Sequence, residues 1–150
     1  PKEQHYKNLI GLVGELTLIE YIFINNSLDL SPYWHTDGSA SRLDFVCPFA
    51  NLEVKTTASN SMRFTIKHDQ LFSVAEKNYL IAIVLEESNA GRTLEEIITS
   101  LNDSPDYCNG LQFSINLEKE KRRVSPIDAK HKRFVLKKAI RLLSLLIAKI

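Results

Sequence analysis

Ser41-Arg-Leu-Asp-Phe-Val-Cys47 and Asn51-Leu-Glu-Val-Lys-Thr-Thr57, joined by Pro48-Phe49-Ala50, form the stretch that decides the fold. Both segments alternate apolar with polar side chains, which is the pattern of strands with one buried face. The proline between them predicts a hairpin. Because proline cannot take the positive φ of two-residue primed turns, a four-residue loop is favoured over a two-residue loop. Either loop sets Asp44 opposite Glu53.

Two carboxylates in this position call for a cation. Directly opposed side chains lie about 4.5–5.5 Å apart at Cβ, and like charges there destabilise a sheet. Mg²⁺ binds through one or two carboxylates, waters and substrate phosphate, and it would resolve the repulsion between Asp44 and Glu53. Lys55 returns to the face of Glu53 about 6.6 Å along the strand, from where it can hold water or stabilise phosphate charge. The alternative interpretation is a surface ladder of ion pairs.

Upstream of this stretch, Lys2–Asn25 is expected to form a helix. Its apolar residues recur at helical spacing: Leu9, Leu12, Val13, Leu16, Ile19 and Phe23. Gly11 and Gly14 interrupt the pattern at a cost of about 1 kcal/mol each relative to alanine, so we expect a close backbone approach at these positions.

Downstream, alternation predicts a strand over Ser61–Lys67, and a short helix is expected at Asp69–Ala75. The unbroken apolar run of Asn78–Leu85 is typical of a strand buried on both faces. Thr93–Leu101 is a predicted helix in which Thr93 is the N-cap.

Two later segments are ambiguous. Leu111–Arg123 has no clear periodicity, and Arg133–Ile150 has a helical apolar pattern that could instead contain a strand. The whole order predicts one α/β domain over residues 1–150. Its central sheet would be mixed, with about four strands flanked by helices in the order α-β-β-β-α-β, followed by extra C-terminal helices.

Composition bounds the class of protein. With 150 residues, 44% hydrophobic and 25% charged, the chain is an ordinary globular protein. Cys47 and Cys108 are too few for a disulfide framework or a zinc site, so we expect a cytoplasmic location. No apolar run approaches roughly 20 residues, and no signal peptide or membrane partner is expected. The only methionine is Met62, so the chain is expected to be a piece of a longer polypeptide.

Charge is unevenly distributed along the chain. Residues 1–118 carry 8 Lys and Arg against 16 Asp and Glu, whereas residues 119–150 carry 11 against 2. A basic C-terminal segment on an acidic body indicates a polyanionic partner, although such a segment can also be a solvated face.

The order of these residues resembles the PD-(D/E)XK, or restriction-endonuclease-like, nuclease superfamily. The resemblance rests on Asp44, a gap of eight residues and Glu53-Val54-Lys55, supported by Gly14-Glu15-Leu16 before them, Thr56-Thr57 after them and the passage Phe64–Leu71. It extends to a branch of PD-(D/E)XK-motif proteins found among bacterial restriction and phage-defence genes. Leu43 stands where the family's name has proline.

This resemblance implies a site. Asp44 and Glu53 would be metal ligands, with the Val54 carbonyl as a further ligand, Lys55 would be the catalytic lysine and Glu15 would assist from the first helix. The implied cofactor is Mg²⁺, for which Mn²⁺ would substitute. DNA contacts are expected from four residues: Thr57, Arg63, Lys67 and Gln70. Arg63 and Lys67 share the polar face of Lys55 if the alternation holds.

The predicted function is therefore metal-dependent endonuclease cleavage of DNA, in restriction or phage defence. Partners would be DNA, other subunits of such a system and a second copy in a homodimer. The alternative is a catalytically silent nuclease-fold module that binds nucleic acid or assembles with a partner. An RNA substrate is a third possibility that the motif does not distinguish.

Overall fold

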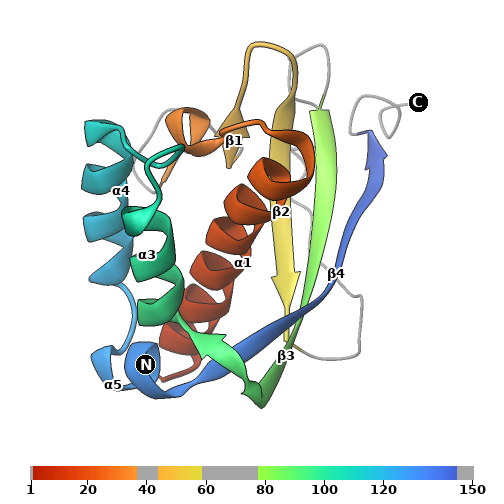
Figure 1. Ribbon diagram of the computed structural model, residues 1–150. Coiled ribbons are helices and arrows are strands. Elements are labelled where there is room, and N and C mark those ends of the chain that lie inside the picture. Colours follow the sequence, from red (N-terminus) through yellow and green to blue (C-terminus); the bar gives the residue numbers. More distant parts are fainter. Residues whose placement is uncertain (1, 37–43, 59–77, 145–150) are drawn as a thin grey trace.

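The computed structural model of the chain describes residues 2–36, 44–58 and 78–144 (Figure 1). Its elements are α1 (Lys2–Asn26), the 3₁₀ turn η1 (Ser31–Tyr33), β1 (Phe45–Val46), β2 (Asn51–Thr57), β3 (Asn78–Thr93), α3 (Leu94–Asp103), α4 (Leu111–Lys121), α5 (Pro126–His131) and β4 (Arg133–Ser144). This is the mixed α/β architecture expected from the sequence. The predicted strand Ser61–Lys67 and helix Asp69–Ala75 lie outside the described residues.

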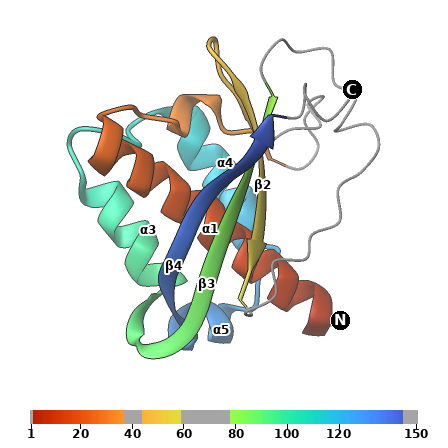
Figure 2. The same cartoon turned by 90° about the vertical axis from the view of Figure 1, so that its right-hand side faces the viewer.

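The four strands form one mixed sheet in the order β1-β2-β3-β4. The two central strands, β2 and β3, are parallel, whereas β1 and β4 pair antiparallel to their neighbours. Figures 1 and 2 show the described helices α1, α3 and α4 on one side of this sheet. The layered arrangement of helices on a mixed sheet agrees with a restriction-endonuclease-like core.

Helix α1 forms the centre of the core, as its periodicity predicts. Leu9, Leu16 and Ile19 are fully buried. A Cβ on Gly14 would collide with the Thr56 side chain of β2, so the expected close approach occurs at this glycine. The same expectation is wrong for Gly11, where a Cβ would meet nothing within 4 Å.

By length and composition α1 is also apolar enough to cross a membrane, and no other helix among the described residues is. Its buried residues nevertheless belong to the hydrophobic core shared with the sheet and α3. A core helix of a globular domain passes the same compositional test, so the packing of α1 accounts for its apolarity.

Strand β3 is longer than the sequence predicts. It continues from the expected Asn78–Leu85 to Thr93, through a polar stretch that has the composition of a turn. The extension is held by β4, because Leu85 pairs with Leu136 and Glu87 with Phe134, after which the ladder is irregular up to Arg92. The ambiguous segment after Arg133 is thus a strand up to Ser144.

Two of the remaining helices, α3 and α5, begin at capping side chains. Thr93 caps α3 as predicted, and it forms a capping box with Glu96 in which each side chain accepts from the other's backbone N–H. The ambiguous segment Leu111–Arg123 forms α4, and Ser125 caps the short helix α5. Both cysteines are buried and free.

Candidate active site

The β1–β2 hairpin brings the predicted metal ligands together. Phe45 pairs with Leu52 and Val46 with Asn51, so one further step along the ladder sets Asp44 opposite Glu53. The loop has the four residues expected, and it is closed by the Cys47 N–H, which donates to the Ala50 carbonyl at 2.9 Å. Strand β1 is shorter than the predicted Ser41–Cys47, of which residues 41–43 lie outside the described part of the chain.

The two faces of β2 differ in their surroundings. Val54 faces the helices and belongs to the main hydrophobic core, as does Ile83 of β3. Glu53 and Lys55 alternate with Val54 and therefore face the other side of the sheet, where their partners on β3 are Leu80 and Ala82. Glu53 and Lys55 therefore leave β2 on the face opposite Val54, while the Glu53 carboxyl remains close enough to α1 for the negative charge of Glu15 to raise its pKa.

Asp44 is attached to the backbone of the motif itself. Its Oδ2 accepts a hydrogen bond of 2.6 Å from the N–H of Val54. The N–H and C=O of one residue in an extended strand point to the same edge, so the Val54 carbonyl also lies on the Asp44 side of β2. The expected role of this carbonyl as a further metal ligand stays a prediction.

Glu53 is buried without sufficient polar partners. The residue is 3% exposed, and within residues 2–36, 44–58 and 78–144 its Oε2 has no hydrogen-bond partner. Burial raises the pKa of Glu53, and the adjoining Asp44 carboxyl raises it further, to about 10. Lys55 opposes this rise, because its Nζ lies 4.0 Å from Oε2. The site therefore has an excess of negative charge that one lysine compensates only in part.

Glu15 approaches the site from α1. The indole Nε1–H of Trp34 donates to its Oε1 at 2.7 Å. Burial raises the pKa of Glu15 well above its usual range, and the negative charge of Asp44 raises it further. The Glu15 carboxyl is consequently near enough to Asp44 for the two groups to influence each other.

Trp34 is a residue whose role the sequence leaves undecided between core packing and shaping of a substrate groove. It is buried and forms an isolated β-bridge with Phe45. It also links Glu15 to α4, since its backbone carbonyl accepts from Asn116 Nδ2 at 3.1 Å. Sequence reasoning missed this link and Asn116 altogether, and no local pattern marks either of them.

Comparison with known proteins agrees with this geometry. Residues 5–117 match the family model described as "Putative PD-(D/E)XK family member, (DUF4420)". The chain belongs to this family. No curated protein and no solved structure gives a significant match. The family match includes Glu15, Asp44, Glu53 and Lys55, and it ends before the basic segment 119–150.

Members of the PD-(D/E)XK superfamily that act as nucleases use divalent metal ions, and the site can be tested for such an ion. Its candidate ligands are all oxygens, which hard divalent cations prefer, and Glu53 Oε2 is a buried acceptor that receives no hydrogen bond from the part of the chain that the structure describes. Within residues 2–36, 44–58 and 78–144, no three His, Cys, Asp or Glu side chains form a metal-holding group. Two carboxylates still suffice for Mg²⁺, which retains several waters.

The structure describes only one of the four residues that are expected to contact DNA. Thr57 is half-buried at the end of β2, opposite Val84. Arg63, Lys67 and Gln70 lie outside the described residues. Their expected contacts with DNA therefore stay predictions.

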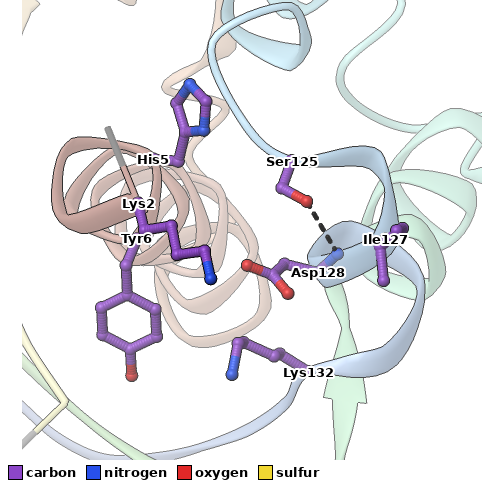
Figure 3. A pocket seen from close by; sticks show the side chains of 7 residues that line it. All are labelled: Lys2, His5, Tyr6, Ser125, Ile127, Asp128 and Lys132. Atoms are coloured by element: carbon purple, nitrogen blue, oxygen red, sulfur yellow. Dashed lines mark hydrogen bonds between the residues drawn. The ribbon is translucent and has the colours of Figure 1, made fainter.

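A separate cavity of about 450 Å³ lies between the start of α1 and α5 (Figure 3). The amino group of Lys2 points toward the Asp128 carboxylate, and the Asp128 N–H donates to Ser125 Oγ at 3.3 Å, whereas Lys132 Nζ lies 3.9 Å from the Glu87 carboxylate. None of the predicted site residues lines this cavity. Its positive charges face carboxylates of the protein itself, so it does not replace the β1–β2 site.

Proposed function

We propose that this PD-(D/E)XK family member is a divalent-metal-dependent endonuclease that hydrolyses phosphodiester bonds in DNA. The observation that carries the proposal is the buried Glu53 carboxyl, which adjoins a second carboxyl on Asp44 and whose Oε2 accepts no hydrogen bond from the described residues. Buried charges without partners cost several kcal/mol, and proteins neutralise them with a proton or a cation. Here the unfavourable burial falls on the carboxyls of the D…ExK motif itself. We therefore expect this site to bind a cation that takes part in the reaction.

Three groups of the motif would bind the metal ion. Asp44 and Glu53, with the Val54 carbonyl, would hold the ion, which we expect to be Mg²⁺ with Mn²⁺ as a substitute. When bound, the ion supplies Lewis acidity and lowers the pKa of water. The hydrogen bond from the Val54 N–H keeps the Asp44 carboxylate in position for this role.

Lys55 and Glu15 act on the reacting groups. The Lys55 ammonium, beside Glu53, can orient the attacking water and stabilise the negative charge that develops on the phosphate. Glu15, oriented by Trp34, can hold a proton because its pKa is raised. Hydrolysis then forms a bond from the water oxygen to phosphorus and breaks the bond to the leaving sugar oxygen, which takes up a proton.

A plasmid-nicking assay tests the proposal. We expect the protein to cut with Mg²⁺ or Mn²⁺, to be inactive in EDTA, and to lose activity in the variants Lys55→Ala and Asp44→Asn. Lys137→Ala is the matched control, because it removes an exposed lysine on β4 whose Nζ lies 3.9 Å from the Glu86 carboxylate. Retained circular dichroism and melting temperature separate chemistry from folding. Normal cutting by Asp44→Asn would contradict the assignment.

One observation favours a second candidate. The described residues offer no three-ligand group for a metal, which would suit a catalytically silent module that binds nucleic acid or assembles with a partner. Salt-sensitive DNA binding by a folded protein that never cuts in Mg²⁺ or Mn²⁺ would support this candidate over the endonuclease.

The biological setting belongs to the same proposal. The sequence resemblance to proteins of bacterial restriction and phage-defence genes supports a defensive role in the cytoplasm, with other subunits or a second copy as partners. Expression in bacteria challenged with phage tests it. We expect fewer plaques with the wild-type chain than with Lys55→Ala, and equal plaque counts would contradict the defensive role.

A further inference from the structure

We infer that the C-terminal end of α4, through Lys119 and Arg122, contacts the phosphate backbone of a DNA duplex beside the candidate carboxylates. This inference rests on the proposed function in one respect, because it takes the same DNA as its ligand. It concerns a surface that lies beyond the family match, which ends at residue 117.

Helix α4 is attached to the site through one residue. The carbonyl of Trp34 accepts from Asn116 of α4, while its indole donates to Glu15. The ring of Phe113, one turn earlier on α4, lies 5.5 Å from the Trp34 ring between centroids. A short chain of buried contacts therefore sets the position of α4 relative to the carboxylates.

The inner face of α4 continues from Asn116 to Glu120, four residues later, and Arg123 follows in the turn after the helix. Asn8 of α1 donates to the Arg123 carbonyl at 2.9 Å, which fixes the end of the helix on α1. Arg123 Nη1 lies 3.4 Å from Glu120 Oε1, so the charges of this inner face balance each other.

The outer face has a different charge balance. Lys121 is paired with Glu118 at 3.3 Å, but Lys119 and Arg122 form no ion pair with any residue in the described ranges. Both are exposed, and their i,i+3 spacing makes them neighbours on the helix surface. They present two uncompensated positive charges on a body whose first 118 residues carry an excess of acidic groups.

Other basic residues of this segment are engaged elsewhere. Arg133 pairs with Glu96 at 2.7 Å, and Lys132 pairs with Glu87 at 3.9 Å. Lys130 and Lys138 also lack an ion pair within the described chain, but Lys130 lies on α5 and Lys138 on β4, the sheet edge opposite β1. Among the uncompensated cations, Lys119 and Arg122 share their helix with the residue that anchors Trp34.

The test compares two double variants that remove equal charge. Lys119→Ala/Arg122→Ala removes the proposed surface, and Lys130→Ala/Lys138→Ala is the matched control. Binding to a fluorescent duplex is measured by anisotropy in EDTA over a range of salt concentrations. We expect the first variant to raise Kd roughly tenfold or more and to reduce the slope of log Kd against log salt by about 1.8. The control should change Kd less than about twofold, by the same reasoning.

Each outcome decides the inference separately from the proposed function. A charge-conserving exchange, Lys119→Arg/Arg122→Lys, should keep wild-type affinity, which excludes a loss caused by helix destabilisation. Three results would contradict the proposed DNA contact: an equal rise in Kd in both double variants, no rise in either, or no duplex binding by the wild type. Duplex binding through these residues without cutting in Mg²⁺ would contradict the endonuclease and support the surface.

Discussion

Val54 and Glu53 are neighbours on β2, and they face opposite sides of the sheet with opposite energetic consequences. Val54 packs into the hydrophobic core beneath α1. Glu53 is equally well buried, yet among the described residues one of its oxygens has no hydrogen-bond donor, and its pKa is raised to about 10. The comparison teaches that one face of this strand stabilises the fold, whereas the other lowers its stability in a way that a bound cation would relieve.

Single substitutions of Glu53 and of Val54 test this comparison with the largest expected effects. Glu53→Gln should reduce DNA cleavage by about 10³-fold or more, since the metal contribution is several kcal/mol. In EDTA at neutral pH the same variant should be more stable by about 1–3 kcal/mol, because an amide folds without the proton uptake that the raised pKa of Glu53 imposes on the wild type. Val54→Ala should do the reverse, with a loss of about 1–3 kcal/mol of stability and normal cleavage per folded molecule.

Urea denaturation and nicking rates at matched folded fractions measure both effects. A Glu53→Gln protein that is less stable than the wild type in EDTA would show that the buried carboxyl contributes to the fold. The contrast between the two faces would then be wrong.

Substitutions of the two glycines of α1 test how closely this helix packs against β2 on the core face of the sheet. Gly14→Ala should destabilise by about 1–3 kcal/mol, because the new methyl group collides with Thr56 of β2. Gly11→Ala should be neutral or stabilising by up to about 1 kcal/mol, since open space surrounds that position. Thermal unfolding of the two variants side by side gives the measurement. Equal melting temperatures would mean that α1 does not lie as close to β2 as described.

The raised pKa of Glu53 predicts a pH dependence of stability. Because the folded protein holds this proton up to a pKa of about 10 while the unfolded chain releases it near pH 4.5, folding binds a proton between these values. Stability in EDTA should fall as pH rises from 5 to 8, by on the order of 1 kcal/mol per unit. Melting temperatures with and without Mg²⁺ check this. We expect Glu53→Gln or saturating Mg²⁺ to flatten the dependence, and an identical slope in the variant would contradict it.

The smallest expected effect concerns the link between the core and the site. Trp34→Phe keeps an aromatic ring in the core and removes the N–H that donates to Glu15 at 2.7 Å. We expect a loss of about 1 kcal/mol of stability and a reduction in cleavage rate of roughly tenfold, consistent with one lost hydrogen bond to a carboxyl. Single-turnover cleavage kinetics provide the measurement. An unchanged rate would show that Glu15 needs no orientation by Trp34.

Local periodicity made much of this site predictable. Alternation along the two segments around Pro48 sets the hairpin, its four-residue loop and the opposition of Asp44 and Glu53, because register in a hairpin follows from its turn. The Thr93 cap and helix α1 were predictable for the same reason. In each case the interacting residues lie within a few positions of one another.

Other features depend on contacts between distant residues. The extension of β3 to Thr93 exists because β4 pairs with it, and the apolar pattern of β4 alone fits a helix as well as a strand. Gly11 and Gly14 have the same sequence signal, but only Gly14 meets another element. A close approach requires a second surface, and periodicity within one helix contains no information about that surface.

The sequence by itself determined the chemistry of the site: two carboxylates and a lysine on one face of a hairpin. Only the tertiary structure decided their energetic state, because the burial of Glu53 and the lack of a hydrogen bond to its Oε2 from the described residues depend on everything packed around the strand. It also decided that Trp34 joins Glu15 to α4, across 82 positions from Trp34 to Asn116. Contacts over such separations arise from packing of the whole domain, which no local pattern of residues encodes.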